Sequence, residues 1–220
     1  MRPWPTSFVR SIAEEPAGGG GEGRPAQAGP IPGRAGAMVR SVLAAARGEG
    51  ARGRAPGVVL RHALELALEP RIATLPDDHH PAYLHPGRVG LILLRDEGRA
   101  EPDLLASAVL LESRDAALRV PLTRIEAELG PEIAGAVARV PRPGSEDLAE
   151  RLVVLGRDAA TAALAERLDH LRHEHLRTPV TPWPELLDET RRIWLPVAER
   201  EAPNLARRYR HWLRAFERRL

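Results

Sequence analysis

The sequence predicts an all-α protein, a multi-helix bundle that follows a disordered N-terminal segment, and two observations support this prediction. From residue 57 onward, apolar residues recur at spacings of three and four, which is the period of a helix with one buried face. Over the first 56 residues Gly, Pro, Ala and Arg dominate and bulky apolar residues are scarce, as in disordered chains. We therefore divide the chain into a disordered segment over 1–56, with at most a short helix over 39–46, and a helical domain over 57–220.

Composition narrows the class of protein further. Of the 220 residues 43% are hydrophobic and 28% charged, which is ordinary for a globular domain. The chain has no cysteine, which excludes disulfides, thiolate zinc ligands and a cysteine nucleophile. No apolar run approaches the roughly 20 residues of a membrane span, and the N-terminus lacks the apolar core of a secretory signal. We therefore expect a cytoplasmic protein with no membrane partner. The only other methionine, Met38, is an alternative translation start.

The high isoelectric point does not indicate that the helical domain over 57–220 binds polyanions. All 32 basic residues are arginines, and residues 57–220 hold 24 of them against 26 acidic residues. A basic strip over 207–219 could meet nucleic acid, but no aromatic residues interleave its polar side. We interpret this strip as a solvated helix face and disfavour nucleic acid as a partner.

Proline and glycine divide the helical domain into successive segments. The first predicted helix begins at Val58 and is ended by Pro70, and the next two begin at His85-Pro86 and at Pro102. Further helices are predicted over 122–129, 133–140, 145–155 (capped by Ser145), 159–173, 184–197 and 205–220. An extended connector is predicted over 178–184, between the helices over 159–173 and 184–197, because its three prolines forbid a helix.

One helical stretch, residues 164–173, carries the first candidate site. At 100° per residue, Glu166, His170 and His173 fall within about 60° of one another on one face. A carboxylate and two imidazoles can hold a divalent metal ion, but such residues are also common on solvated helix surfaces. From the spacing alone, both interpretations stay open.

Four segments, in this order along the chain, carry a resemblance to a known family. Residues 83–86 (YLHP) resemble the "YLxHP" helix start, and 122–140 resemble the "TxxEIxxxFGxxV" segment; residues 164–168 (LAERL) resemble "LADRL", and 189–198 resemble "ETxxIYxPLA". Together they resemble the HD-domain metal-dependent phosphohydrolases. Within that superfamily the chain is most similar to the hydrolase domain of the bifunctional alarmone enzymes and to the small stand-alone alarmone hydrolases.

This resemblance implies a manganese site, or a site for another divalent metal, but one with altered ligands. His85 matches the family's first ligand. The family's His-Asp pair falls on Leu111 and Glu112, and its last aspartate falls on Glu166, so one imidazole is lost and two carboxylates are longer by a methylene. His170 replaces a substrate-contacting asparagine and becomes either a fourth metal ligand or a substrate contact.

The resemblance also implies roles in catalysis and substrate binding. The family's catalytic Glu-Asp pair falls on Asp115 and Ala116, which leaves Asp115 as a proton carrier, with Glu112 as a second catalytic carboxylate. His170 and Arg167 are the expected substrate contacts. A further metal ligand could come from the loop that holds Asp77, Asp78, His79 and His80.

Two functions follow from this altered site. In the first, the metal site is degraded, the protein is weak or inactive as a hydrolase, no cofactor is needed, and the domain binds a nucleotide, another small phosphorylated ligand or a partner protein. In the alternative, the ligand set is rewired, and the protein is a divalent-metal-dependent phosphohydrolase of nucleotide polyphosphates such as (p)ppGpp. The sequence leaves open whether the protein is an enzyme.

Overall fold

The computed structural model describes residues 31, 33–48, 56–75, 80–174 and 182–218. Every regular element in these ranges is helical, which confirms the predicted all-α class. The α-helices are α1 (Gly33–Gly48), α2 (Pro56–Thr74), α3 (His85–Leu91), α4 (Pro102–Val109), α5 (Leu122–Leu129), α6 (Pro131–Arg139), α7 (Leu148–Val154), α8 (Arg157–His173), α9 (Trp183–Glu189), α10 (Leu195–Glu201) and α11 (Pro203–Glu217). Short 3-10 turns are η2 (Pro81–Leu84), η4 (Leu111–Arg114) and η5 (Ala116–Leu118), and π-helical turns are η3 (Ile92–Glu97) and η7 (Thr190–Trp194). None of the described helices has both the length and the apolarity that crossing a membrane requires.

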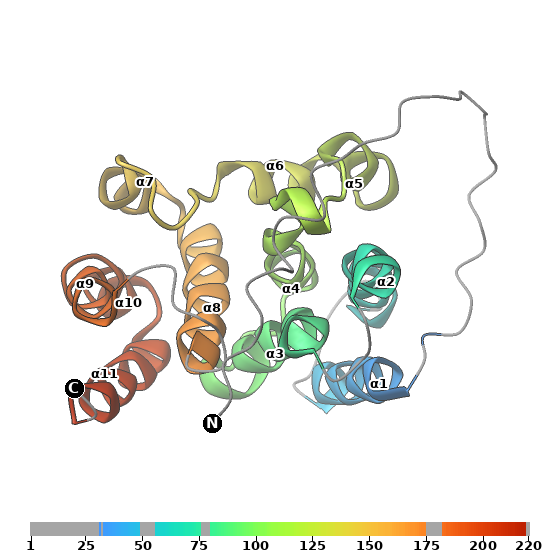
Figure 1. Ribbon diagram of the computed structural model, residues 1–220. Coiled ribbons are helices and arrows are strands. Elements are labelled where there is room, and N and C mark those ends of the chain that lie inside the picture. Colours follow the sequence, from blue (N-terminus) through green and yellow to red (C-terminus); the bar gives the residue numbers. More distant parts are fainter. Residues whose placement is uncertain (1–30, 32, 49–55, 76–79, 175–181, 219–220) are drawn as a thin grey trace.

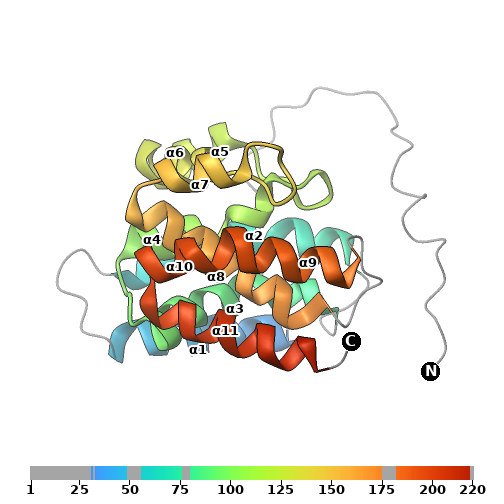
Figure 2. The same cartoon turned by 90° about the vertical axis from the view of Figure 1, so that its left-hand side faces the viewer.

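Helix α8 lies at the centre of the bundle. It contacts α3 and α4 on one side and α10 and α11 on the other, while α5, α6 and α7 lie along one end of the molecule (Figures 1 and 2). Buried alanines along α8 keep its surface thin, so that helices on both sides can pack against it. This central position carries the residues of α8 into the interior, where a polar side chain must find a partner.

The predicted disorder of residues 1–56 is wrong for residues 33–48, which form α1, while residues 1–30 lie outside the described residues. Helix α1 packs against α2 and α3, and it buries Val42 and Leu43 in the common core. A Cβ atom added at Gly87 of α3 would lie 2.1 Å from Met38 Sδ, so α1 approaches α3 closely. The helical body therefore begins well before residue 57. The sequence predicted at most a short helix over 39–46, because the stability of α1 comes from packing and its many alanines and glycines give it little apolar bulk.

Replacing Leu43 with alanine tests this packing of α1. The side chain is 3% exposed, so we expect the free energy of unfolding to fall by about 2–5 kcal/mol in urea titrations. Ser41→Ala, at an exposed position on the same helix, should change it by less than about 0.5 kcal/mol. Equal stability of both variants would show that α1 is not part of the folded core.

Helix α2 does not end at Pro70, as the sequence predicted, but continues to Thr74. A proline inside a helix removes a backbone donor and costs about 3 kcal/mol or more. The residue that follows it, Arg71, is fully buried and donates hydrogen bonds to the carbonyl oxygens of Ala67 and Ala82. These tertiary contacts hold the last turn of the helix in spite of Pro70.

The predicted cap at Ser145 is wrong, and the predicted connector over 178–184 lies mostly outside the described residues. Ser145 does not cap α7, because its Oγ donates to Arg142 O and the helix starts only at Leu148. Helix α9 already begins at Trp183, inside the predicted connector. The helix starts at Pro86 and Pro102 agree with the prediction, and α6 begins at Pro131, two residues before the predicted 133.

Helix α11 is fastened to α8 by two polar side chains within its buried stripe. Tyr209 donates its hydroxyl to Leu164 O at 2.7 Å, and Trp212 Nε1 donates to Leu171 O at 2.9 Å. Burial raises the pKa of Tyr209 well above its usual range. The folded protein therefore keeps this proton at pH values where an exposed tyrosine has lost it.

The chain is unusually suited to measuring this effect, because it has no lysine or cysteine and only two tyrosines. Tyrosine in the unfolded chain loses its proton near pH 10, so the stability of the native protein should fall as the pH rises above about 10. Tyr209→Phe should cost about 1 kcal/mol at pH 8, from the lost hydrogen bond, and should show a weaker decline above pH 10. Parallel stability curves of the variant and the native protein between pH 8 and 11 would contradict this assignment.

Candidate metal centre

The four metal ligands suggested by the sequence converge in space from three elements. Glu166 and His170 project from α8, His85 begins α3, and Glu112 lies in η4. His170 Nε2 lies 3.0 Å from Glu166 Oε1 and 3.5 Å from Glu112 Oε1. His85 Nε2 lies 3.8 Å from Glu112 Oε2. Residues separated by up to 85 positions therefore meet at one point beside the central helix.

Three of these residues have the geometry of a metal-binding set. His85, Glu166 and His170 each offer one donor atom, and the three atoms lie within 4.8 Å of one another. Ligands around one divalent ion at bonds of 2.0–2.2 Å are typically roughly 3–4 Å apart, so only small side-chain movements are needed. The two imidazole rings face each other with centroids 4.5 Å apart.

The ring of His85 is oriented by Asp169, a residue that the sequence reasoning missed. His85 Nδ1 donates to Asp169 Oδ2 at 2.7 Å, which directs Nε2 toward Glu112. Arg88 holds the same carboxylate with contacts of 2.8 and 2.9 Å. A carboxylate on the outer nitrogen of a ligating histidine is the usual support of a metal site. Asp169 could have been suspected from its position three residues after Glu166 on the same helix.

The buried Asp169 carboxyl is held in its ionised form. Burial alone would raise its pKa, but the hydrogen bonds from His85 and Arg88 outweigh burial and keep the pKa well below the usual range. The carboxylate can therefore only accept hydrogen bonds, and this leaves His85 Nδ1 as the donor. The Nε2 atom of a neutral His85 is then free of hydrogen and can act as a ligand.

Glu112 differs from the other three, because it already has a cationic partner. The fully buried Arg71 pairs with Glu112 Oε2 and also donates to Ala82 O at 3.0 Å. Burial lowers the pKa of Arg71, and the charge of Glu112 opposes this change. Leu111, beside Glu112, is buried and offers no donor atom. The charge of Glu112 is thus compensated by a guanidinium.

Two further carboxyl groups of the site have shifted pKa values in opposite directions. Burial favours the protonated form of Glu166, but His170 and His85 outweigh it, and the pKa is lowered. The pKa of Asp115 is raised, first by partial burial and then by the negative charges of Glu112 and Glu166. Glu166 is therefore ionised and ready to bind a cation, whereas Asp115 retains its proton to a higher pH than an isolated aspartate.

Other residues that the sequence brought forward are placed elsewhere. Arg167, an expected substrate contact, faces α9 and η7. It donates to Glu189 at 2.8 Å and lies over the ring of Trp194, away from the proposed metal ligands. His173 turns back to Asp169, with Nδ1 2.8 Å from the carbonyl oxygen. His80 accepts a hydrogen bond from the backbone of η2. The other proposed loop ligands, Asp77, Asp78 and His79, lie outside the described residues.

Comparisons with known proteins add no relative. No family model matches the chain, and no curated protein or solved structure matches it significantly. The resemblance to the HD-domain phosphohydrolases therefore remains a prediction. The function is best argued from the arrangement of the side chains themselves.

Proposed function

We propose that this protein is a metal-dependent hydrolase of the HD-domain type, with a divalent ion held by His85, Glu166 and His170. The observation that carries the proposal is the cluster of His85, Glu166 and His170, whose donor atoms lie within 4.8 Å of one another, with His85 oriented by Asp169. Within this class we propose a phosphohydrolase of nucleotide polyphosphates such as (p)ppGpp, with manganese as the first metal to test. The substrate class rests on the four sequence segments that resemble the alarmone hydrolases.

The donor set fits a catalytic metal. Three protein ligands of two imidazoles and one carboxylate leave positions open for water and substrate, as in other catalytic metal sites. A divalent ion held there lowers the pKa of a coordinated water and makes a nucleophile available near neutral pH.

The surrounding carboxyl groups can carry the protons of a hydrolysis. The Glu112 carboxylate, held by Arg71, can accept a proton from an attacking water through Oε1, which lies on the His170 side. The Asp115 carboxyl, whose pKa is raised, can donate its proton to the oxygen of a leaving phosphate group.

A second function is favoured by the pairing of Arg71 with Glu112. A guanidinium places a permanent positive charge beside the carboxylate, and Leu111 offers no donor where the family has a ligating histidine. In this alternative the guanidinium of Arg71 balances the charge of Glu112, and no metal ion is needed for this. The domain would then bind a nucleotide or a partner protein without hydrolysing anything.

Manganese titration calorimetry of the full-length protein distinguishes the two functions. We expect one bound Mn²⁺ per chain, and a loss of affinity of at least about 100-fold in His85→Ala. His211→Ala, which removes an exposed histidine of α11, should bind as the native protein does. No binding at millimolar Mn²⁺ would refute the metal centre and favour the binding module.

Activity is then tested on the loaded protein. We expect Mn²⁺-dependent release of pyrophosphate from (p)ppGpp, and its loss in Glu166→Gln. Stoichiometric metal binding without turnover of this or other nucleotide polyphosphates would refute the proposed substrate class while keeping the metal centre.

A further inference from the structure

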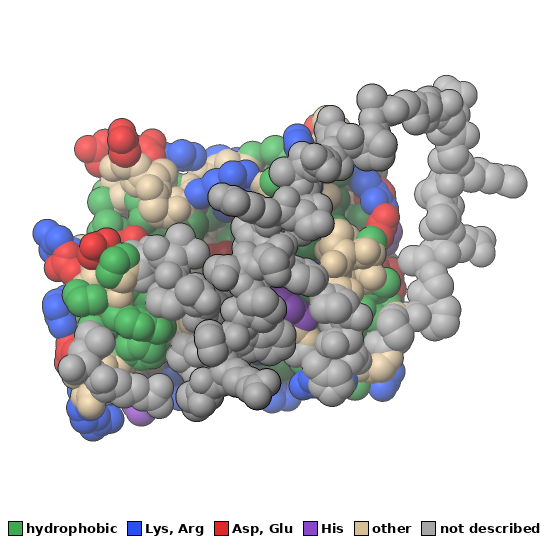
Figure 3. All heavy atoms as spheres, viewed as in Figure 1, with side chains coloured by type: hydrophobic (Ala, Val, Ile, Leu, Met, Phe, Trp, Pro, Cys, Tyr) green, Lys and Arg blue, Asp and Glu red, His purple; other side chains and the backbone are tan. Residues whose placement is uncertain are grey.

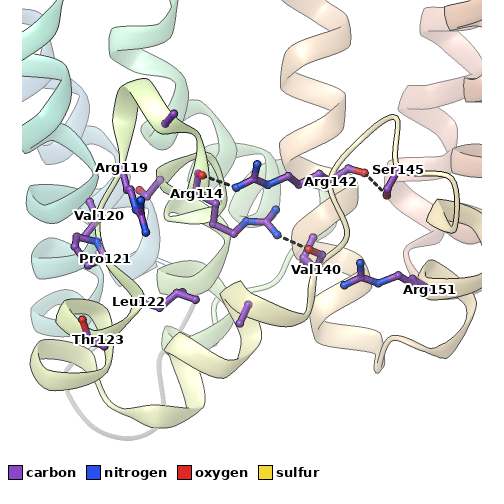
Figure 4. A pocket seen from close by; sticks show the side chains of 13 residues that line it. Arg114, Arg119, Val120, Pro121, Leu122, Thr123, Val140, Arg142, Ser145 and Arg151 are labelled. Carbon is purple, nitrogen blue, oxygen red and sulfur yellow. Dashed lines mark hydrogen bonds between the residues drawn. The ribbon is translucent and has the colours of Figure 1, made fainter. Parts of the chain in front are cut away.

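A cavity of about 730 Å³ lies against η4, the turn that also carries Glu112. Its walls come from η4 and η5, the start of α5, the end of α6, the loop that follows α6, and α7. Four arginines line it: Arg114, Arg119, Arg142 and Arg151. None of the described lining residues is acidic. Arg119 enters from one side and Arg142 and Arg151 from the other, with Arg114 between them (Figure 4). Figure 3 shows basic side chains on the surface between α6 and α7.

The positive charge of this arginine pocket is largely uncompensated. Arg114 donates to the carbonyl oxygens of Leu111 and Val140. Arg142 donates to the carbonyl oxygen of Arg114. Arg119 has no hydrogen bond or ion pair with any described residue. Arg151 of α7 donates to Arg139 O at 3.4 Å, and its carboxylate contact, with Asp147, is long at 3.8 Å.

Arginines elsewhere on the surface are paired differently. Arg124 contacts both Glu69 and Glu128, and Arg99 contacts Glu101 and Asp158. Near the arginine pocket, Asp115 is close enough for Arg142 to influence its pKa, but among the described residues it forms no ion pair with any of the four arginines. The charges of Glu166 and Asp115 also act on Arg114, but a set of four guanidiniums with so few carboxylate partners favours an anion that joins it.

A hydroxyl group without a partner gives independent support for a ligand. Ser113, which borders the pocket, is fully buried, and its Oγ has no hydrogen-bond partner among the described residues. A buried hydroxyl without a partner costs free energy. A polar group that enters when a ligand rearranges this wall of the pocket would satisfy the Ser113 hydroxyl.

We propose that the arginine pocket binds a small organic phosphate, with its phosphate group among the guanidiniums. Guanidinium groups match phosphate oxygens with pairs of charge-assisted hydrogen bonds. The cavity volume lies within the usual range for small-molecule sites. Its apolar wall of Val120, Pro121, Leu122 and Val140 accommodates the uncharged part of the ligand. The site uses none of the proposed metal ligands, so it does not rest on the metal centre.

The proposal is tested by titration calorimetry of the full-length protein in EDTA, with three probes: inorganic phosphate, adenosine 5′-monophosphate and adenosine. We expect the nucleotide to bind more tightly than phosphate and adenosine not to bind. Arg119→Gln, at an exposed position without a partner, should weaken nucleotide binding at least about tenfold. Arg119→Gln/Arg142→Gln should abolish it.

The matched control is Arg214→Gln, which removes the same charge from an exposed position on α11 and should change the affinity less than about twofold. Equal affinity of the native protein and Arg119→Gln would overturn the location, and no binding of phosphate or nucleotide at millimolar concentration would overturn the site. Phosphate binding as tight as nucleotide binding would overturn the organic ligand in favour of the free anion. Because EDTA is present throughout, failure of the metal centre leaves these outcomes unchanged.

Discussion

Replacing Arg71 with methionine is expected to lower the free energy of unfolding by about 3–5 kcal/mol, the range for breaking a buried ion pair from one side. Arg71 is 0% exposed, and its removal leaves the Glu112 carboxylate buried without its guanidinium partner. The carbonyl oxygens of Ala67 and Ala82 also lose a donor. Urea unfolding of the purified variant at neutral pH measures the effect.

An exposed arginine provides the control for this experiment. Arg124 bridges Glu69 and Glu128, but its side chain is 39% exposed, so Arg124→Met should cost no more than about 1 kcal/mol. The double variant Arg71→Met/Glu112→Leu should recover most of the lost stability, because an apolar pair replaces a buried ionic one. A double variant no more stable than Arg71→Met would show that the carbonyl contacts of Arg71, and not the ion pair, determine its effect.

The Arg71→Met variant also separates the two proposed functions. If the metal centre is real, loss of Arg71 leaves Glu112 available as a further ligand, and Mn²⁺ should stabilise Arg71→Met more than the native protein. Thermal unfolding with and without Mn²⁺ measures this difference. An absence of stabilisation by Mn²⁺ in both proteins would favour the metal-free binding module.

Replacing Asp169 with asparagine is expected to weaken Mn²⁺ binding by about 10–100-fold, the usual effect of removing an outer partner of a ligating histidine. The change keeps the shape of the side chain but removes the charge that holds His85 and Arg88. Because Asp169 is buried and Arg88 is partly exposed, we also expect a loss of about 3 kcal/mol in stability.

Asp158→Asn serves as the matched control on the same helix. Its side chain is 66% exposed and pairs with Arg99, so the change should affect stability by less than about 1 kcal/mol and leave metal affinity unaltered. Calorimetric titration and urea unfolding measure both quantities for each variant. If Asp169→Asn binds Mn²⁺ as tightly as the native protein, then Asp169 does not orient His85 for metal binding.

Local patterns predicted many of the helices correctly. The helix starts at Pro86 and Pro102 were predicted because proline is favoured at the first helical positions, and that preference is local. The predicted helix end at Pro70 was wrong because the buried contacts of Arg71 hold the helix beyond it, and these contacts depend on residues distant in the sequence. For the same reason the sequence predicted only part of α1, residues 39–46, as helical, since the core face of α1 gains its stability from α2 and α3.

The candidate site was predicted in part. The four-residue spacing of Glu166 and His170 placed them on one helix face, and the resemblance added His85 and Glu112; the structure brings all four together. The spacing also suggested His173, which the structure turns toward the backbone of Asp169. A helix face 60° wide contains several residues, and neighbouring helices decide which of them face the site.

The sequence by itself determined that the chain is helical, where prolines begin its helices, and that Glu166 and His170 stand side by side. Each of these properties depends on residues a few positions apart. Only the tertiary structure decided that Arg71 neutralises Glu112 and that Asp169 orients His85, pairs that are 41 and 84 residues apart. The energies of such pairs depend on burial and on distances between helices, which are set when the bundle packs.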